Sequence, residues 1–210
     1  MKPNQTRISF NEFDDAPKTE YMYLFFDTET TGLPRNWRAP ITDLNNWPRM
    51  VQIAWILSDK TGSRIEAGDF IIKPENFVIP LNTTRIHGIS TEKALHEGKN
   101  LLEILTKFND LVNEAEYLVA HNISFDEKII GAEFLRMGME SNFLKKRKLC
   151  TMKSSTNYCR IPGPYGFKYP KLSELHFRLF GEDFDEAHNA AVDIHATEKC
   201  FWEMRKRGWI

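Results

Sequence analysis

The chain runs Tyr21-Met22-Tyr23-Leu24-Phe25-Phe26 directly into Asp27-Thr28-Glu29-Thr30-Thr31-Gly32-Leu33. The apolar and aromatic run at its start predicts a buried β-strand that leads into Asp27. Side chains at positions i and i+2 of a strand point to the same side, so Asp27 and Glu29 project together. Two adjacent carboxylates beside a hydrophobic strand repel each other unless a cation compensates. Their hard oxygen atoms suit Mg²⁺ or Mn²⁺. A solvated strand end explains this pair alone equally well.

The segments that follow predict a mixed sheet. Val51–Ser58 and Arg64–Lys73 have strand character, and the short turn Asp59–Gly62 between them predicts an antiparallel hairpin. The apolar residues between Leu101 and Ala115 fall on one helical face. Further strands are predicted at Tyr117–Ala120 and Leu149–Met152, and further helices at Ser124–Met137, Leu172–Phe180 and Ala190–Lys206. We therefore expect an α/β domain whose mixed five-stranded sheet, antiparallel hairpin strands followed by parallel strands, is flanked by helices.

The composition is that of an ordinary globular protein, with 41% hydrophobic and 27% charged residues in a chain of 210. The 28 basic and 29 acidic residues sum to −1. Net charge therefore gives no sign of a nucleic-acid partner, although a basic cleft fits within a neutral protein. Residues 1–20 are polar and we expect them to be loosely ordered, whereas residues 21–210 are predicted to form one folded domain.

No segment has the features of a membrane span or a secretion signal. No apolar run approaches the ~20 residues that a membrane-spanning helix needs, and residues 1–20 lack the apolar core of a secretory signal. The three cysteines, Cys150, Cys159 and Cys200, form no paired motif. Reduced thiols in a cytoplasmic protein without a membrane partner are the expected interpretation.

A second acidic position follows the predicted strand Tyr117–Ala120. The chain continues His121-Asn122-Ile123-Ser124-Phe125-Asp126. Asp126 suits the first turn of a helix, where the helix dipole favours a carboxylate, with Ser124 as the cap. A functional role for Asp126 is as plausible as this local one. For His121 we favour local hydrogen bonding over metal ligation.

A third acidic position lies near the end of the chain, in His188-Asn189-Ala190-Ala191-Val192-Asp193. Five helical residues rise about 7.5 Å, so His188 at a helix mouth and Asp193 further in could flank one site. The alternative is a helix with one solvated polar face. Small residues at Ala190 and Ala191 permit close approach to a sheet, where a polar side chain needs a partner.

These acidic positions form three motifs in order along the chain. They are Asp27-x-Glu29-Thr30-Thr31-Gly32-Leu33, His121-Asn122-x-x-Phe125-Asp126 and His188-x-x-x-x-Asp193. Together they resemble the motifs of the DEDDh 3′–5′ exonucleases, a family that includes the proofreading epsilon subunit of bacterial DNA polymerase III. Ile86-His87-Gly88-Ile89 is similar to a segment that the family carries between its first and second motifs. A sister branch has Tyr where this chain has Asn189, so the resemblance is to the His branch.

The resemblance implies a ribonuclease H-like fold and a hydrolase with two divalent ions, Mg²⁺ or Mn²⁺, beside the sheet. By analogy Asp27 bridges both ions, Glu29 and Asp193 complete the shell of one, and Asp126 supports the other. His188 would take a proton from the attacking water, since an unperturbed imidazole titrates near ~6.5 and is a usable base at neutral pH. The product would be a 5′-mononucleotide.

The resemblance also implies contacts with the end of the substrate. Backbone groups around Thr30 and Thr31 would meet the terminal nucleotide, and Leu33 would wedge against bases. His87 and Phe125 would line the pocket for that nucleotide. For Phe125 a core contact at a helix start is an equally good interpretation.

Other features have two interpretations each. Trp37 and Trp47, in the proline-containing loop that follows Gly32, could contact single-stranded substrate, but we favour packing of the loop onto the domain. The basic runs at 145–148 and 205–207 are expected to be solvated rather than phosphate-binding. A mobile cover over the substrate, formed by the loop at 161–170, is also compatible with the sequence.

Three functions remain open from the sequence. A 3′–5′ exonuclease acting on single-stranded or frayed DNA is the first, and an RNA-trimming exoribonuclease of the same motif class is the second, because no motif reports on the 2′-hydroxyl. A catalytically idle nucleic-acid-binding domain is disfavoured by the retained carboxylates. The proofreading relatives contact a polymerase through a tail, and this chain ends 17 residues after Asp193, which predicts that such a tail is absent.

Overall fold

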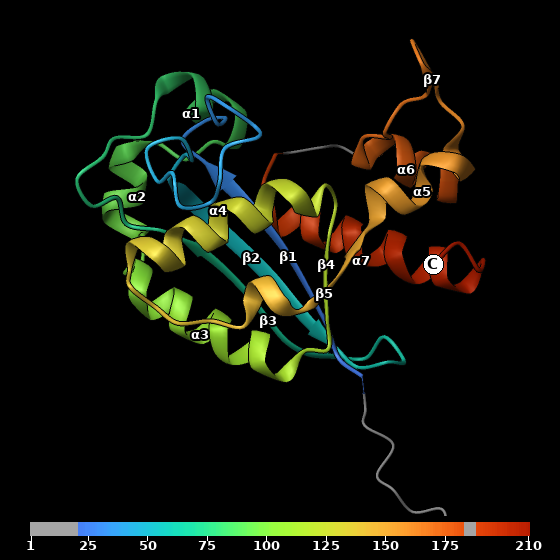
Figure 1. The fold of residues 1–210 in the computed structure, drawn as a ribbon, viewed down its shortest axis with the longest axis horizontal. Helices are drawn as coiled ribbons and strands as arrows, with labels where there is room; N and C mark the ends of the chain where they lie inside the picture. Colours follow the sequence, from blue (N-terminus) through green and yellow to red (C-terminus); the bar gives the residue numbers. More distant parts are fainter. Residues whose placement is uncertain (1–20, 183–187) are drawn as a thin grey trace, which may run out of the picture.

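In the computed structural model, which describes residues 21–182 and 188–210, a five-stranded sheet forms the centre of the molecule (Figure 1). Its strands are β1 (Tyr23–Thr30), β2 (Met50–Ser58), β3 (Arg64–Ile71), β4 (Tyr117–Ala120) and β5 (Arg147–Cys150), in the order β3-β2-β1-β4-β5. β1, β2 and β3 pair antiparallel, whereas β4 pairs parallel to both β1 and β5. The predicted mixed α/β sheet is thereby confirmed. The expectation for residues 1–20 lies outside the described residues.

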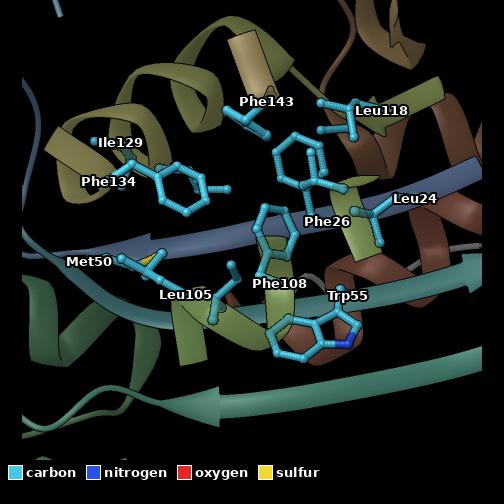
Figure 2. Close-up of a cluster of buried hydrophobic side chains, with 14 of the residues drawn as sticks. Leu24, Phe26, Met50, Trp55, Leu105, Phe108, Leu118, Ile129, Phe134 and Phe143 are labelled. Carbon is cyan, nitrogen blue, oxygen red and sulfur yellow. The ribbon is translucent and has the colours of Figure 1, made fainter. Parts of the chain in front are cut away.

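Strand β1 is buried on both faces because its side chains alternate between two cores. Leu24 and Phe26 pack into a large cluster beneath α3 (Leu101–Glu114) and α4 (Ile123–Arg136), where Trp55, Phe108 and Phe143 surround them (Figure 2). Tyr23 and Phe25 point to the opposite face and pack against α7 (Ala190–Lys206). This two-residue period explains the unbroken apolar run that precedes Asp27.

The end of β1 extends beyond its parallel neighbour. β4 pairs only with Tyr23–Phe25, whereas the antiparallel pairing with β2 continues to Thr30. A register irregularity lies between Glu29 and Thr30. On the side of β1 that β4 leaves open after Phe25, the first turn of α4 accepts a hydrogen bond from the N–H of Thr28 through Asp126.

Several elements were not predicted. α1 (Leu81–His87) and α2 (Thr91–Glu97) are short helices, and α1 leaves Leu81 and Ile86 exposed, so neither has an apolar face to detect. α5 (Thr151–Cys159), the one-turn helix η1 (Phe143–Lys145) and the hairpin β6 (Pro162–Gly163)–β7 (Gly166–Phe167) were also missed. α6 (Leu172–Phe180) and α7 have the predicted bounds.

The predicted fifth strand, Leu149–Met152, was misplaced. β5 begins at Arg147 and ends at Cys150, and α5 begins at the next residue. β5 is an edge strand, so it tolerates the exposed side chain of Arg147. Because β5 begins with Arg147 and Lys148, the apolar pattern that predicts strands starts only at Leu149.

The described helices include none that is both long enough and apolar enough to cross a membrane. Cys150, Cys159 and Cys200 are free thiols. The two basic runs hold local contacts: Lys146 donates to the carbonyls of Asn113 and Ala115, and Arg205 donates to the Tyr23 hydroxyl. These side chains therefore contact the protein itself, whereas we expected both runs to be solvated; their lack of phosphate binding stays a prediction.

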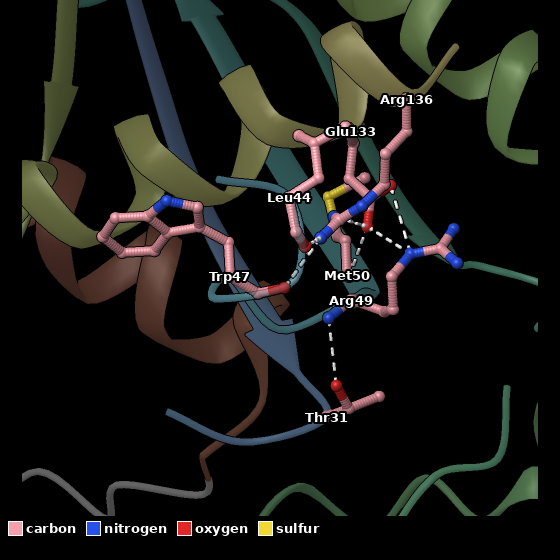
Figure 3. A network of polar contacts seen from close by, with 7 residues as sticks. All are labelled: Thr31, Leu44, Trp47, Arg49, Met50, Glu133 and Arg136. Atoms are coloured by element: carbon pink, nitrogen blue, oxygen red, sulfur yellow. Dashed lines mark hydrogen bonds and ion pairs between the residues drawn. The ribbon is translucent and has the colours of Figure 1, made fainter. Parts of the chain in front are cut away.

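The loop between β1 and β2 is anchored by a fully buried carboxylate, Glu133 of α4 (Figure 3). Arg49 Nε and the backbone N–H of Met50 donate to Glu133 Oε1 at 2.9 and 3.0 Å. Arg136 pairs with the same carboxylate at 2.9 Å and donates to the carbonyls of Leu44 and Trp47, each at 2.7 Å. Thr31 in turn accepts from the N–H of Arg49 at 3.0 Å. The network therefore joins the end of β1, the loop and α4.

We expect Glu133→Ala to lower the free energy of unfolding by about 3 kcal/mol, because it leaves two guanidinium groups without their buried partner. Urea denaturation followed by circular dichroism measures this loss. The matched control is Glu103→Ala, which breaks the exposed pair between Glu103 and Lys107 and should leave the midpoint almost unchanged. Equal midpoints for the two variants would contradict the anchoring role of Glu133.

Candidate active site

Three carboxylates from two distant parts of the chain meet at the end of β1. Asp27, Glu29 and Asp193 each place one oxygen atom so that these atoms lie within 4.8 Å of one another. Asp27 and Glu29 share a side of β1, and Asp193 stands in the first turn of α7. The side chain of Asn189 caps that helix by accepting from the N–H of Ala191 at 3.0 Å. The sequence-predicted convergence of these three side chains is present in the structure.

Asp126 approaches the same region from α4 and is almost completely buried. Its Oδ1 accepts hydrogen bonds from the hydroxyl and the backbone N–H of Thr28, at 2.8 and 3.1 Å. Thr28 lies between Asp27 and Glu29, so these bonds fix α4 against the acidic end of β1. The predicted capping role of Ser124 is wrong: α4 begins at Ile123 after Asn122, whose backbone is left-handed with φ 66°. Ser124 instead donates to the Asn122 side chain.

The four carboxyl groups cannot all carry charge easily. Burial, followed by the charges of Asp126, Glu29 and Asp193, raises the pKa of Asp27 well above its ordinary value. Burial and the charges of Asp193 and Asp126 raise the pKa of Glu29 to about 8. Burial raises the pKa of Asp126 to about 7, against the opposing effect of the Thr28 hydrogen bonds. Oxygen-only donors with this excess of negative charge fit a hard divalent cation such as Mg²⁺ or Mn²⁺.

His188 immediately precedes the Asn189 cap of α7, so its predicted position at the mouth of this helix is confirmed. A shared site with Asp193 stays a prediction. The side chain of His188 is exposed, and its backbone has φ 40°, a conformation that costs energy for a residue with a Cβ. His121 has the local role we favoured, with its Nδ1 3.0 Å from Thr151 Oγ1 and its Nε2 3.1 Å from the Pro170 carbonyl oxygen.

A cavity of about 450 Å³ opens beside the carboxylates and shares Glu29 with them. Of the predicted substrate-contacting residues, it brings together Thr30, Leu33, His87 and Phe125. Thr31 is not in the lining, because its N–H and hydroxyl are engaged by Arg49. The cavity is completed by residues of β1, of the loop after it and of α1 that we did not predict as substrate contacts, namely Thr28, Gly32, Asn82, Thr83 and Ile86.

Gln52 is a positioning residue that the sequence interpretation missed. It is buried opposite Glu29 in the β1–β2 register. Its Nε2 donates to Asp69 Oδ1 at 2.6 Å, and its Oε1 accepts from the N–H of Ala190 at 3.4 Å. These bonds tie the start of α7, and hence Asp193, to β2 and β3. The sequence did contain a signal for this role: Gln52 is the one amide side chain in an otherwise largely apolar strand, and a buried polar group needs partners.

Comparison with known proteins agrees with this arrangement. A family model described as an exonuclease, RNase_T, matches residues 24–201. The chain belongs to this exonuclease family. The predicted exonuclease class is thereby confirmed, and the 3′–5′ direction of the reaction stays a proposal.

Relatives of this exonuclease domain include much larger proteins. It is 26% identical to the PolC-type DNA polymerase III of Staphylococcus haemolyticus and 27% identical to that of Staphylococcus aureus, each over 200 residues. These alignments cover 90% of this chain and 12% of each polymerase.

Among solved structures, E. coli exonuclease I in complex with a dA16 oligonucleotide superimposes with a TM-score of 0.71 at 20% identity, covering 90% of this chain and 41% of that one. A zinc-bound complex of the same enzyme with single-stranded DNA gives a TM-score of 0.69 at 22% identity, covering 90% and 41%. The chain therefore spans less than half the length of the proteins it matches.

The raised pKa of Glu29 predicts how the stability of the metal-free exonuclease depends on pH. Between pH 4.5 and about 8 the folded protein retains a proton at Glu29 that the unfolded chain has lost. Stability therefore falls as pH rises through this window. Glu29→Gln removes the titration, so we expect it to stabilise the metal-free protein at pH 8 by roughly 1–2 kcal/mol and to reduce the pH slope.

Thermal or urea unfolding in the presence of a chelator, at several pH values, tests this expectation. The control is Glu66→Gln, a change of an exposed glutamate on β3 that should follow the wild-type curve. A Glu29→Gln protein with the wild-type slope and no gain in stability at pH 8 would show that Glu29 ionises normally.

Proposed function

We propose that this domain is a divalent-metal-dependent 3′–5′ exonuclease that removes 5′-mononucleotides from single-stranded or frayed DNA. The observation that carries the proposal is the group of carboxylates with raised pKa values, which shares Glu29 with a cavity of about 450 Å³. A charge-rich site beside an apolar pocket suits a substrate with a phosphate and a base. Family membership supports the same reaction class.

The acidic residues would hold the metal. Asp27, Glu29 and Asp193 offer oxygen atoms to one region, and Asp126 adds a fourth carboxylate whose orientation Thr28 fixes. When bound, Mg²⁺ or Mn²⁺ supplies Lewis-acid activation of the phosphate and a nucleophile at neutral pH, and two such ions are proposed here. The cluster of raised pKa values means that cations and protons compete for these side chains.

His188 would act as the general base. It is exposed and stands immediately before the capped start of the helix that carries Asp193, so solvent has access to its ring. Its strained backbone is the kind of feature that persists where function requires it. We propose that its imidazole accepts the proton of the attacking water.

The cavity would hold the terminal nucleotide. Leu33 and Phe125 supply apolar surface for the base, and Thr30 and His87 supply polar groups near the sugar. Burial lowers the pKa of His87, and its Nδ1 accepts from the N–H of Ile89, so the ring is neutral at pH 7. Single-stranded DNA is favoured as substrate by the exonuclease I complexes, whose oligonucleotides are DNA. A polymerase partner and a cytoplasmic location stay predictions.

Asp27→Ala should lower exonuclease activity by about a thousandfold or more, because the residue is central to the carboxylate group. The assay uses DNA and RNA oligonucleotides labelled at either end, with Mg²⁺, Mn²⁺ or EDTA. Ladders shortened from the 3′ end of DNA, absent in EDTA, are expected. Activity that survives both EDTA and Asp27→Ala would refute the metal mechanism. Faster shortening of RNA than of DNA would show that RNA, not DNA, is the preferred substrate.

His188→Ala should lower kcat by about 10²–10⁴-fold with little change in KM, since a general base acts only in the chemical step. Because the His188 side chain is exposed, added imidazole should restore part of the lost rate. His195→Ala, which removes an exposed histidine of α7, is the matched control and should retain wild-type kcat. Unchanged kcat in His188→Ala would remove this residue from the base role.

A further inference from the structure

We propose that Trp37 extends the nucleotide-binding surface, and that its indole, which contacts Phe125, stacks on the base adjacent to the terminal nucleotide of the DNA strand. This inference rests on the proposed function. Trp37 lies in the segment between β1 and β2, outside the three acidic motifs. It would be a residue that determines the affinity for strands longer than one nucleotide.

Contacts connect Trp37 to the reaction site. The ring of Trp37 lies 5.7 Å from the ring of Phe125, centroid to centroid, at an interplanar angle of 46°. Phe125 lines the cavity that Glu29 also lines, and Asp126 follows Phe125 directly in α4. The aromatic pair therefore lies at the rim of the proposed nucleotide pocket.

Trp37 remains 55% exposed although its loop is fixed. On either side of it, Asn36 N–H donates to Asn46 Oδ1 at 2.7 Å, and the N–H of Arg38 donates to Asn36 Oδ1 at 2.9 Å. Asn46 returns a bond from its Nδ2 to the Asn36 carbonyl at 2.9 Å. An ordered backbone thus presents a large aromatic ring to solvent.

The second tryptophan of the loop shows the contrast. Trp47 is buried, and its Nε1 donates to the Pro40 carbonyl at 3.0 Å. The expectation that both tryptophans pack the loop onto the domain therefore holds for Trp47 and only in part for Trp37, whose ring contacts Phe125 but is 55% exposed. Anchoring of the loop through Trp47 and the Glu133 network leaves Trp37 available for another surface.

A DNA strand is the occupant that the surroundings fit best. Arg35 and Arg38 flank Trp37 and are both exposed, so positive charge accompanies the aromatic ring. Leu33 and Ile86, which are 72% and 54% exposed, add apolar surface at the cavity. Stacking on an aromatic ring tolerates any base, and a base stacked on Trp37 must leave its own helical stack. The arrangement would therefore favour single-stranded ends.

The test compares two substrates, a short oligothymidylate and the nitrophenyl ester of thymidine 5′-monophosphate, which contains only one nucleoside. Trp37→Ala should raise KM for the oligothymidylate about tenfold and leave kcat and KM for the ester unchanged. Trp37→Phe should retain most of the wild-type affinity because it keeps an aromatic face. Phe177→Ala, which removes a ring of α6 that is likewise 55% exposed, should match the wild type on both substrates.

The outcomes separate this inference from the proposed function. A wild-type protein that cleaves neither substrate would refute the exonuclease proposal itself. A wild-type protein that cleaves both, with Trp37→Ala kinetics unchanged on the oligothymidylate, would overturn only the stacking role. Equal losses on both substrates in Trp37→Ala and Trp37→Phe would show that Trp37 supports the fold of the pocket rather than a base.

Discussion

Repulsion among four carboxyl groups is the constraint on which the rest of the structure depends. Asp27 and Glu29 stand on β1, Asp126 on α4 and Asp193 on α7. Burial raises the pKa values of Asp27, Glu29 and Asp126, and the charges of neighbouring carboxylates raise those of Asp27 and Glu29 further. Such an arrangement destabilises the protein unless protons or cations bind. It persists because the surrounding elements hold it: Thr28 fixes Asp126, and Gln52 fixes the start of α7. In the proposed metal-dependent reaction, bound cations would neutralise these carboxylates, which explains why the protein keeps them together.

The scaffold around the carboxylates is correspondingly rigid. β1 is buried on both faces, since Leu24 and Phe26 pack on one side and Tyr23 and Phe25 on the other. Glu133 connects the 32–49 loop to α4, the helix that also carries Phe125 and Asp126. The proposed metal ligands, the pocket and the exposed Trp37 therefore share one support. Substrate binding and metal binding can be preorganised by the same packing.

Much of this could be predicted from residue patterns, and the exceptions have physical reasons. The β1 run, the apolar face of α3 and the acidic motifs are periodic or closely spaced signals, so they located the sheet and the carboxylates. α1 contributes Asn82, Thr83 and Ile86 to the cavity, yet its exposed Leu81 and Ile86 show no apolar face. β5 begins with polar residues, and the Asn122 turn replaced the expected Ser124 cap. Glu133 and Gln52 act through partners far away in the chain, which spacing along a sequence does not reveal.

The most direct test of the metal site is anomalous X-ray diffraction from crystals grown or soaked with Mn²⁺. The account predicts anomalous peaks bounded by the carboxylates of Asp27, Glu29 and Asp193, with Asp126 beside them, and a loss of these peaks in crystals of Asp27→Asn. Manganese bound elsewhere, or an ordered cluster that holds no manganese at a concentration supporting catalysis, would contradict it.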